Sequence, residues 1–281
     1  MIHKRKTSFR AALFIVLSTE MCLIGRSSAE TIKIAGSGGA LAVMQALGDA
    51  FGKKHPGTRV MIAPGLGSGG ARRALLGGAL DLAVTSKPGN AVERTEGTVP
   101  YRYGSAPFLV AVAQSNPVTN LSTRELVEIY GGTITSWPNG QRLRVILRPE
   151  TEPDTEVLKS ISSDMERALK AAHSREGMML AVTEQDSAKG IETVPGAIGI
   201  SGLASVLAEK RAMKGVSING RPPSVKAIAD GTYPWFKTYY LLTKREPSAS
   251  SRLFLEFVLS PGGRQILSLF GHWLPEAQAA R

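Results

Sequence analysis

The chain has 281 residues, 43% of them hydrophobic, and a formal net charge of +11, which is long enough for one large domain or two smaller ones. Its basic residues are scattered and aromatic residues make up only 6% of the sequence, so a nucleic-acid groove is not favoured. A positive balance fits the capture of small anions, and equally fits weak binding to nucleic acid or a membrane surface.

The first 29 residues have the layout of a secretory signal peptide. A basic start at residues 3–10 is followed by an apolar run at 11–17 and by small residues at 27–29. The apolar run is too short to span a bilayer, so we expect cleavage before Glu30 and export to the periplasm. Removing this segment leaves 29 basic and 22 acidic residues, a net charge of +7, and removes Cys22, the single cysteine.

The next part of the chain alternates between strand-like and helix-like segments. We expect strands at 31–35, 58–63 and 80–84, and helices at 40–54 and 71–76. The longer helix carries Leu41, Met44, Leu47 and Phe51 three or four residues apart, which is typical of an amphipathic helix. Such alternation predicts a parallel sheet covered by helices, with ligands beyond the carboxyl ends of its strands.

The remainder of the chain continues the α/β pattern without an internal repeat. Ser122 and Glu125 have the spacing of a capping box at the start of a helix. The expected strands are 107–113, 143–147, 196–200 and 239–243, and the expected helices are 123–130, 156–173, 251–259 and one that follows Pro261.

Two glycine-serine loops are the most informative feature of the sequence. Gly36-Ser37-Gly38-Gly39-Ala40 and Gly65-Leu66-Gly67-Ser68-Gly69-Gly70 each follow an expected strand and precede an expected helix. A turn of this kind directs unpaired backbone N–H groups and the positive end of the helix dipole at one point. With Ser86 after the third strand, the loops predict an anion held largely by backbone amides.

Other interpretations of the second loop are weaker. It matches the G-x-G-x-x-G dinucleotide pattern, but Thr85-Ser86-Lys87 stands where an acidic ribose partner is expected. Simple turn glycines are a further alternative. Ser68 lacks the G-x-S-x-G context of a nucleophile, and no histidine is placed to activate it. No cluster of His and Cys indicates a metal site.

Arg148 ends an expected strand and precedes Pro149. Its guanidinium could reach a cleft between two lobes. The alternative is a solvated arginine like Arg142 and Arg144, and the charge pattern alone favours this second interpretation.

Together these residues resemble the phosphate-binding family of periplasmic solute-binding proteins, the receptors of phosphate ABC importers. The resemblance covers nearly all of the chain after residue 29 and is that of a divergent member. Besides the two loops and the edge at Thr85-Ser86-Lys87, it rests on Leu121-Ser122 through Tyr130-Gly131-Gly132, Ile134-Thr135-Ser136-Trp137, Gly196-Ala197-Ile198-Gly199 and Asp230-Gly231-Thr232-Tyr233-Pro234.

The resemblance implies an α/β fold of two lobes with mixed sheets, a ligand cleft between the lobes and two crossing strands as the hinge. The first lobe is expected at 30–112 and 238–281, and the second at 113–237. A monomer without catalytic activity or cofactor would pass a small oxyanion to an ABC permease at the inner membrane. The residues expected at the ligand are Gly39, Ala40, Leu41, Ser68, Gly69, Ser86, Arg148, Asp154 and Thr155.

The sequence departs from the family after Arg148. The family has a small-residue turn, Ser-Gly-Thr, where this chain has Glu152, Pro153 and Asp154. Proline has no N–H to donate, and carboxylates repel a bound dianion unless they are protonated or paired. One interpretation is that Asp154 or Thr155 caps a helix that begins near Glu156. Another is that Asp154 pairs with Arg148 and fills the anion position, or accepts a proton from the ligand.

A second departure is Ser86, where some members of the family have an aspartate that selects protonated phosphate. Two alternatives to import remain open. One is a periplasmic sensor or accessory protein with the same cleft, and the other is an exported hydrolase that uses Ser68.

Overall fold

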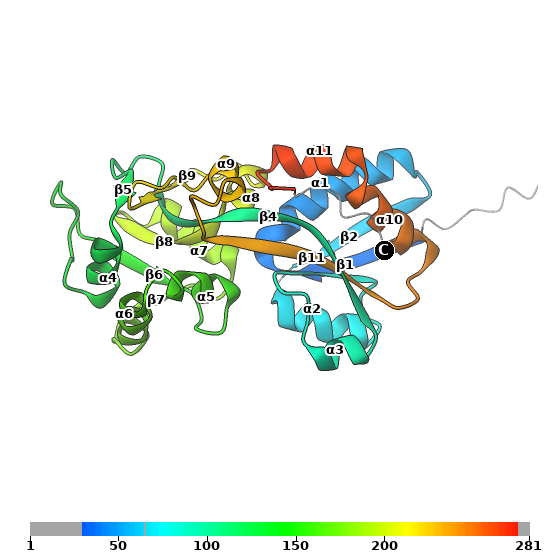
Figure 1. Ribbon diagram of the computed structural model, residues 1–281, viewed down its shortest axis with the longest axis horizontal. Helices are drawn as coiled ribbons and strands as arrows, with labels where there is room; N and C mark the ends of the chain where they lie inside the picture. Colours follow the sequence, from blue (N-terminus) through cyan, green and yellow to red (C-terminus); the bar gives the residue numbers. More distant parts are fainter. Residues whose placement is uncertain (1–29, 65, 275–281) are drawn as a thin grey trace, which may run out of the picture.

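The computed structural model describes residues 30–64 and 66–274 (Figure 1). The expected signal peptide at 1–29, with Cys22, lies outside the described residues. Within the described part of the chain, no helix combines the length and apolar character needed to cross a membrane.

The strands of the described chain are β1 (Glu30–Gly36), β2 (Thr58–Ala63), β3 (Leu82–Thr85), β4 (Thr98–Ala113), β5 (Asn120–Leu121), β6 (Arg144–Leu147), β7 (Met179–Leu180), β8 (Ala197–Gly202), β9 (Met213–Gly215), β10 (Ser217–Ile218) and β11 (Phe236–Lys244). The helices are α1 (Gly38–Lys54), α2 (Gly67–Leu76), α3 (Ala91–Thr95), α4 (Thr123–Gly131), α5 (Pro153–Lys159), α6 (Ser163–His173), α7 (Glu184–Thr193), α8 (Leu203–Ala208), α9 (Val225–Ala229), α10 (Ala249–Leu259) and α11 (Pro261–Leu269).

The main sheet is mixed and runs through the whole molecule. Its strand order is β2-β1-β3-β11-β4-β8-β6-β7, with β9 paired to β4. The pairs of β1 with β2 and β3 are parallel, as expected, and β11 is antiparallel to both β3 and β4. The carboxyl ends of β1, β2 and β3 therefore meet at one edge, from which the chain enters α1 and α2.

Two lobes lie at the two ends of the long strands β4 and β11, which run from one lobe into the other (Figure 1). On β4, Tyr103 and Ala106 pack in the core beneath α1 and α10, whereas Phe108 and Val110 pack in the core around α4 and α6. Trp235, just before β11, packs in the core around α4 and α6, whereas Tyr239 of β11 packs in the core beneath α1 and α10. These are the two crossing strands of a two-lobe binding-protein fold. The domain bounds expected from the sequence stay a prediction.

Local chemistry accounts for the best-predicted helix. Ser122 accepts from the Glu125 amide while the Glu125 carboxylate accepts from the Ser122 amide, so both donors at the start of α4 are satisfied. Gly132 ends the helix with φ of +88°, a conformation that glycine adopts at little cost.

The single helix expected at 156–173 is wrong. The structure has α5 and α6, separated at residues 160–162. Ser162 is in an extended conformation and its hydroxyl accepts from the Met165 amide. This side-chain cap satisfies a backbone donor and allows a new helix to start. Because the apolar periodicity is the same on both sides of the break, it does not reveal the break in the sequence.

Candidate functional site

The first lobe contributes a helix N-terminus to the site. Helix α1 begins at Gly38 without an acidic residue in its first turn and without a side-chain cap. The Ala40 amide donates to the Ser37 carbonyl at 3.0 Å, and the positive end of the helix dipole faces the site without a side-chain anion of its own helix. Among the residues expected at the ligand, Gly39 and Ala40 are buried in this first turn, and Leu41 is half-buried.

The expected second loop is partly helix. Residues Gly67–Gly70 form the first turn of α2, so the expected helix start at residue 71 is wrong. Ser68 lies in this turn, and its buried hydroxyl has no hydrogen-bond partner among the described residues. The Ser86 hydroxyl at the end of β3 is buried and unpartnered in the same sense. Gly69, by contrast, is exposed.

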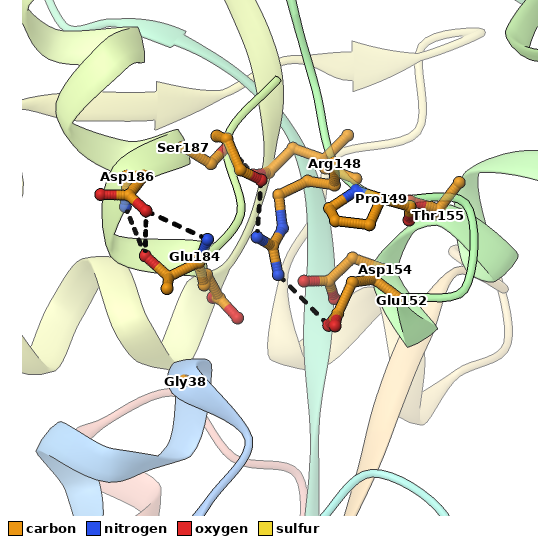
Figure 2. A network of polar contacts seen from close by, with 12 residues as sticks. Gly38, Arg148, Pro149, Glu152, Asp154, Thr155, Glu184, Asp186 and Ser187 are labelled. Carbon is orange, nitrogen blue, oxygen red and sulfur yellow. Dashed lines mark hydrogen bonds and ion pairs between the residues drawn. The ribbon is translucent and has the colours of Figure 1, made fainter. Parts of the chain in front are cut away.

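Arg148 is buried, with 5% of the residue exposed, so the interpretation as a solvated arginine is wrong. One terminal nitrogen donates to the Ala181 carbonyl at 2.8 Å, and the other contacts Glu152 Oε2 at 3.2 Å (Figure 2). Its Nε is buried and has no partner within the described chain. A carbonyl and a carboxylate therefore hold the guanidinium in place and leave one donor available.

The structure corrects two of the roles expected of Asp154 and Thr155, which are the capping of a helix near Glu156 and the pairing of Asp154 with Arg148. Helix α5 begins at Pro153 with Glu152 as its N-cap, and neither residue caps it through its side chain. The Thr155 hydroxyl donates to the Pro149 carbonyl at 2.9 Å. Asp154 pairs with Lys237 at 2.6 Å, not with Arg148. Since Pro153 places Asp154 in the first turn of α5, its carboxylate points at the crossing strand β11.

Lys237 and Glu184 belong to the site and were not predicted from the sequence. Lys237 on β11 is buried and contacts Glu184 Oε2 at 3.2 Å as well as Asp154. Burial alone would lower the pKa of Lys237, but the two carboxylates outweigh burial and hold that pKa well above its ordinary value. Burial raises the pKa of Glu184; Lys237 opposes this rise, and Asp154 adds to it.

The Glu184 carboxylate lies against the first turn of α1. A Cβ built on Gly39 would lie 2.6 Å from Glu184 Oε1 and 2.8 Å from its Cδ. The neighbouring Gln185 donates from Nε2 to the Gly38 carbonyl at 3.1 Å. Figure 2 shows the Glu184 side chain pointing from α7 toward the start of α1 at Gly38. A carboxylate of the second lobe thus lies against the helix start beside which the sequence predicts an external anion.

A motif in the sequence marks the helix that carries Glu184. Thr183 and Asp186 form a capping box at the start of α7, with reciprocal backbone bonds of 3.0 and 3.1 Å. The Thr-x-x-Asp spacing is visible in the sequence and predicts a helix N-terminus. Lys237 has no comparable signal, because its partners come from α5 and α7, far away in the chain.

Two of the expected site residues, Arg148 and Ser86, line two separate hollows. One, of about 230 Å³, is lined from both lobes by Gly38, Gly67, Arg148 and Glu184 among others. The other, of about 350 Å³, is lined by Ser86 together with Pro153 and Lys237 among others. The ion pair of Lys237 with Glu184 connects the two hollows, since Lys237 lines the larger one and Glu184 lines the smaller one.

The described residues offer little for catalysis. They contain no group of three or more His, Cys, Asp and Glu side chains that could hold a metal ion. The Ser68 hydroxyl has no hydrogen-bond partner in the described chain, so no general base contacts it, as a serine nucleophile requires.

Residues 24–261 match the sequence family described as "PBP superfamily domain", and the chain belongs to this superfamily of solute-binding proteins. Among curated proteins, it is 25% identical to the phosphate-binding protein PstS of Bacillus subtilis, over 82% of this chain and 75% of that protein. That relative is named for binding phosphate.

Two solved structures illustrate the fold. A putative phosphate ABC transporter substrate-binding protein with bound phosphate from Clostridium perfringens superposes with a TM-score of 0.75 at 19% identity, covering 88% of this chain and 100% of that one. The substrate-binding domain of a putative molybdenum ABC transporter from Clostridium difficile superposes with a TM-score of 0.55 at 14% identity, covering 86% and 97%. At these identities, the structures show the two-lobe fold alone.

Proposed function

We propose that this protein is a periplasmic substrate-binding protein that captures a small oxyanion of the phosphate class for an ABC importer. The observation that carries the proposal is the buried Arg148, whose Nε has no partner in the described chain and whose side chain lines the same hollow as the first turn of α1. A guanidinium donor and a helix N-terminus at one cleft are complementary to an oxyanion.

Each part of the cleft has a role in binding and none requires a covalent step. Amides of the first turn of α1 donate to one side of the anion, and the Ser68 and Ser86 hydroxyls donate as neutral groups. Arg148 supplies a charge-assisted bond from the second lobe. Bending of β4 and β11 between the lobes brings these donors onto the ligand.

The charges of the cleft favour a ligand of low charge. Glu152, Asp154 and Glu184 outnumber Arg148 and Lys237, and these groups are connected by the ion pairs of the structure. A fully ionised dianion therefore meets more repulsion here than a protonated oxyanion does.

The relatives support import, since one carries phosphate binding in its name and another is described as part of a phosphate ABC transporter. A signal peptide at residues 1–29, which the sequence predicts, would be required for this role. Glu152, Pro153 and Asp154, which replace the small-residue turn expected of the family, favour a second candidate. This is a periplasmic sensor or accessory protein that uses the same cleft without transport.

Titration calorimetry on residues 30–281 tests the proposal with phosphate, sulfate, molybdate and small carboxylates. We expect saturable binding of phosphate at one site, and loss of this binding in Arg148→Ala. Arg148→Lys retains the positive charge but lacks the planar set of guanidinium donors, so this variant should bind phosphate weakly. The matched control is Arg124→Ala, because Arg124 is an exposed residue of α4. The proposal is contradicted if the protein binds none of these anions, or if a folded Arg148→Ala variant binds phosphate with unchanged affinity.

A further inference from the structure

Glu184 is a buried carboxylate to which the binding mechanism above assigns no contact with the ligand. Only 3% of the residue is exposed. Its Oε2 accepts from Lys237, while its Oε1 is buried without a hydrogen-bond partner in the described chain. A buried carboxylate oxygen without a donor is costly, and it persists only where the surrounding structure holds it.

The structure shows what holds it. The carboxylate is pressed against Gly39, at the positive end of the 17-residue helix α1. It lies beside the first turn of α1 without an amide of that turn donating to its Oε1, and it is attached to the opposite lobe. Gln185, the next residue, bonds to the Gly38 carbonyl and to Glu209 Oε1 at 3.2 Å, which fixes the start of α7 against the first lobe.

The charged groups of the described chain that act on this carboxylate come from β11, α5 and the end of β6. Lys237 on β11 contacts it directly, Asp154 on α5 shares Lys237 with it, and Arg148 at the end of β6 acts at longer range. Asp154 retains Lys237 as a partner if Glu184 moves. The cation therefore stays neutralised, and departure of Glu184 removes one negative charge from the anion position.

We propose that Glu184 is an internal competitor of the ligand: its carboxylate occupies the anion position at the N-terminus of α1, and an incoming oxyanion must displace it. This inference rests on the proposed function and adds its regulation. Glu184 sets the affinity of the cleft by competition. It does not act as an acceptor for a proton of the ligand.

Replacing Glu184 by glutamine separates these roles. The change keeps the shape of the side chain and removes its charge. If Glu184 competes, Glu184→Gln binds phosphate and sulfate both more tightly, by at least about tenfold at low salt, because one repulsive charge is removed from the anion position. If Glu184 accepts a ligand proton, the variant loses affinity for phosphate and not for sulfate.

The experiment measures both anions by calorimetry on the wild type, Glu184→Gln and the control Glu192→Gln. Glu192 belongs to the same helix, but its carboxylate pairs with Arg211 and accepts from the Ala212 amide. The control makes the same change in net charge and should leave both affinities unchanged.

A gain for both anions that is confined to Glu184→Gln supports the inference. Unchanged or weaker binding in that variant, while the wild type binds phosphate, overturns the competitor role and leaves the proposed function intact. The same gain in Glu192→Gln also overturns it, since net charge then explains the effect. Failure of wild type and variants to bind either anion overturns the proposed function and this inference together.

Discussion

The two halves of the cleft bind by different chemistry. The first-lobe half consists of a helix N-terminus and the unpartnered hydroxyls of Ser68 and Ser86, and it carries no charged side chain among the residues assigned to the ligand. The second-lobe half holds Arg148 with Glu152, and Asp154 and Glu184 with Lys237 of the crossing strand. In our proposal the neutral half offers an anion position, whereas the charged half supplies both a cation for the ligand and a carboxylate that competes with it.

Lys237→Met is expected to have the largest effect on stability. It leaves Asp154 and Glu184 buried without their cation, and breaking a buried pair from one side costs about 3–5 kcal/mol. Urea denaturation measures the loss. Lys244→Met is the matched control, since Lys244 is an exposed residue at the end of the same strand; its stability should stay within about 0.5 kcal/mol of the wild type. Equal losses in the two variants would contradict the role of the ion pairs.

Acid should destabilise the first lobe through His272. Burial lowers the pKa of His272 from 6.5 to about 4, so the folded protein keeps this ring neutral while the unfolded chain protonates it. Stability therefore falls as pH falls from 6.5 to 4, by about 3 kcal/mol in all. Denaturation at several pH values compares the wild type with His272→Gln, in which this part of the acid sensitivity should be lost. An unchanged pH profile in the variant would show that another group is responsible.

Glu184 should change the stability with pH in the opposite direction to His272. Its pKa is raised in the folded protein because of burial, so the folded state binds the proton at a higher pH than the unfolded chain does. Its contribution to stability is present at low pH and is lost as pH rises through the folded pKa. In Glu184→Gln, stability should accordingly fall more steeply on acidification than in the wild type. A shallower fall would mean that Lys237 dominates the ionisation of Glu184.

The contact between the two halves can be measured by a double-mutant cycle. Gly39→Ala places a Cβ against the Glu184 carboxylate, and such overpacking costs about 1–3 kcal/mol. In the Glu184→Ala background the same change should be neutral or stabilising, which gives a coupling energy above about 1 kcal/mol. Gly52→Ala is the control, because its Cβ would lie 3.7 Å from the Thr58 carbonyl oxygen; as a change in a helix it should stabilise by up to about 1 kcal/mol. Additive effects would place Glu184 away from Gly39.

Ser86→Ala should have the smallest effect on the fold. Its hydroxyl has no partner within the described chain, so stability should change by less than about 0.5 kcal/mol. Phosphate affinity should fall about tenfold, the size of one hydrogen bond. The control is Ser174→Ala, an exposed hydroxyl bonded to the Lys170 carbonyl, which should leave affinity unchanged. A loss of stability in Ser86→Ala without a loss of affinity would remove Ser86 from the binding site.

The neutral half could be predicted from the sequence because it is encoded locally. Glycines between a strand and a helix specify a helix N-terminus whatever the remainder of the chain does. The parallel pairing of β1 with β2 and β3 then brings the loops to one edge. Even here, residues Gly67–Gly70 form helix where a loop is expected, because a helix N-terminus tolerates glycine.

The charged half could be predicted only in part, because its contacts join distant segments. The hypothesis that Asp154 pairs with Arg148 is wrong, and the hypothesis that an internal carboxylate fills the anion position stays a prediction, which we now transfer to Glu184. Lys237 draws Asp154 away to β11, and Glu184 reaches α1 from a helix that the sequence interpretation missed. Pairing of this kind depends on the crossing of β11 between the lobes, which no local pattern specifies.

The most direct test of the account is a crystal structure of the protein with arsenate, an isostere of phosphate that is located by its anomalous scattering. We expect one arsenic peak in the cleft, beside the first turn of α1 and within hydrogen-bond distance of Arg148, with the Glu184 carboxylate displaced from Gly39. A peak outside the cleft, or arsenate bound while Glu184 stays against Gly39, would contradict it.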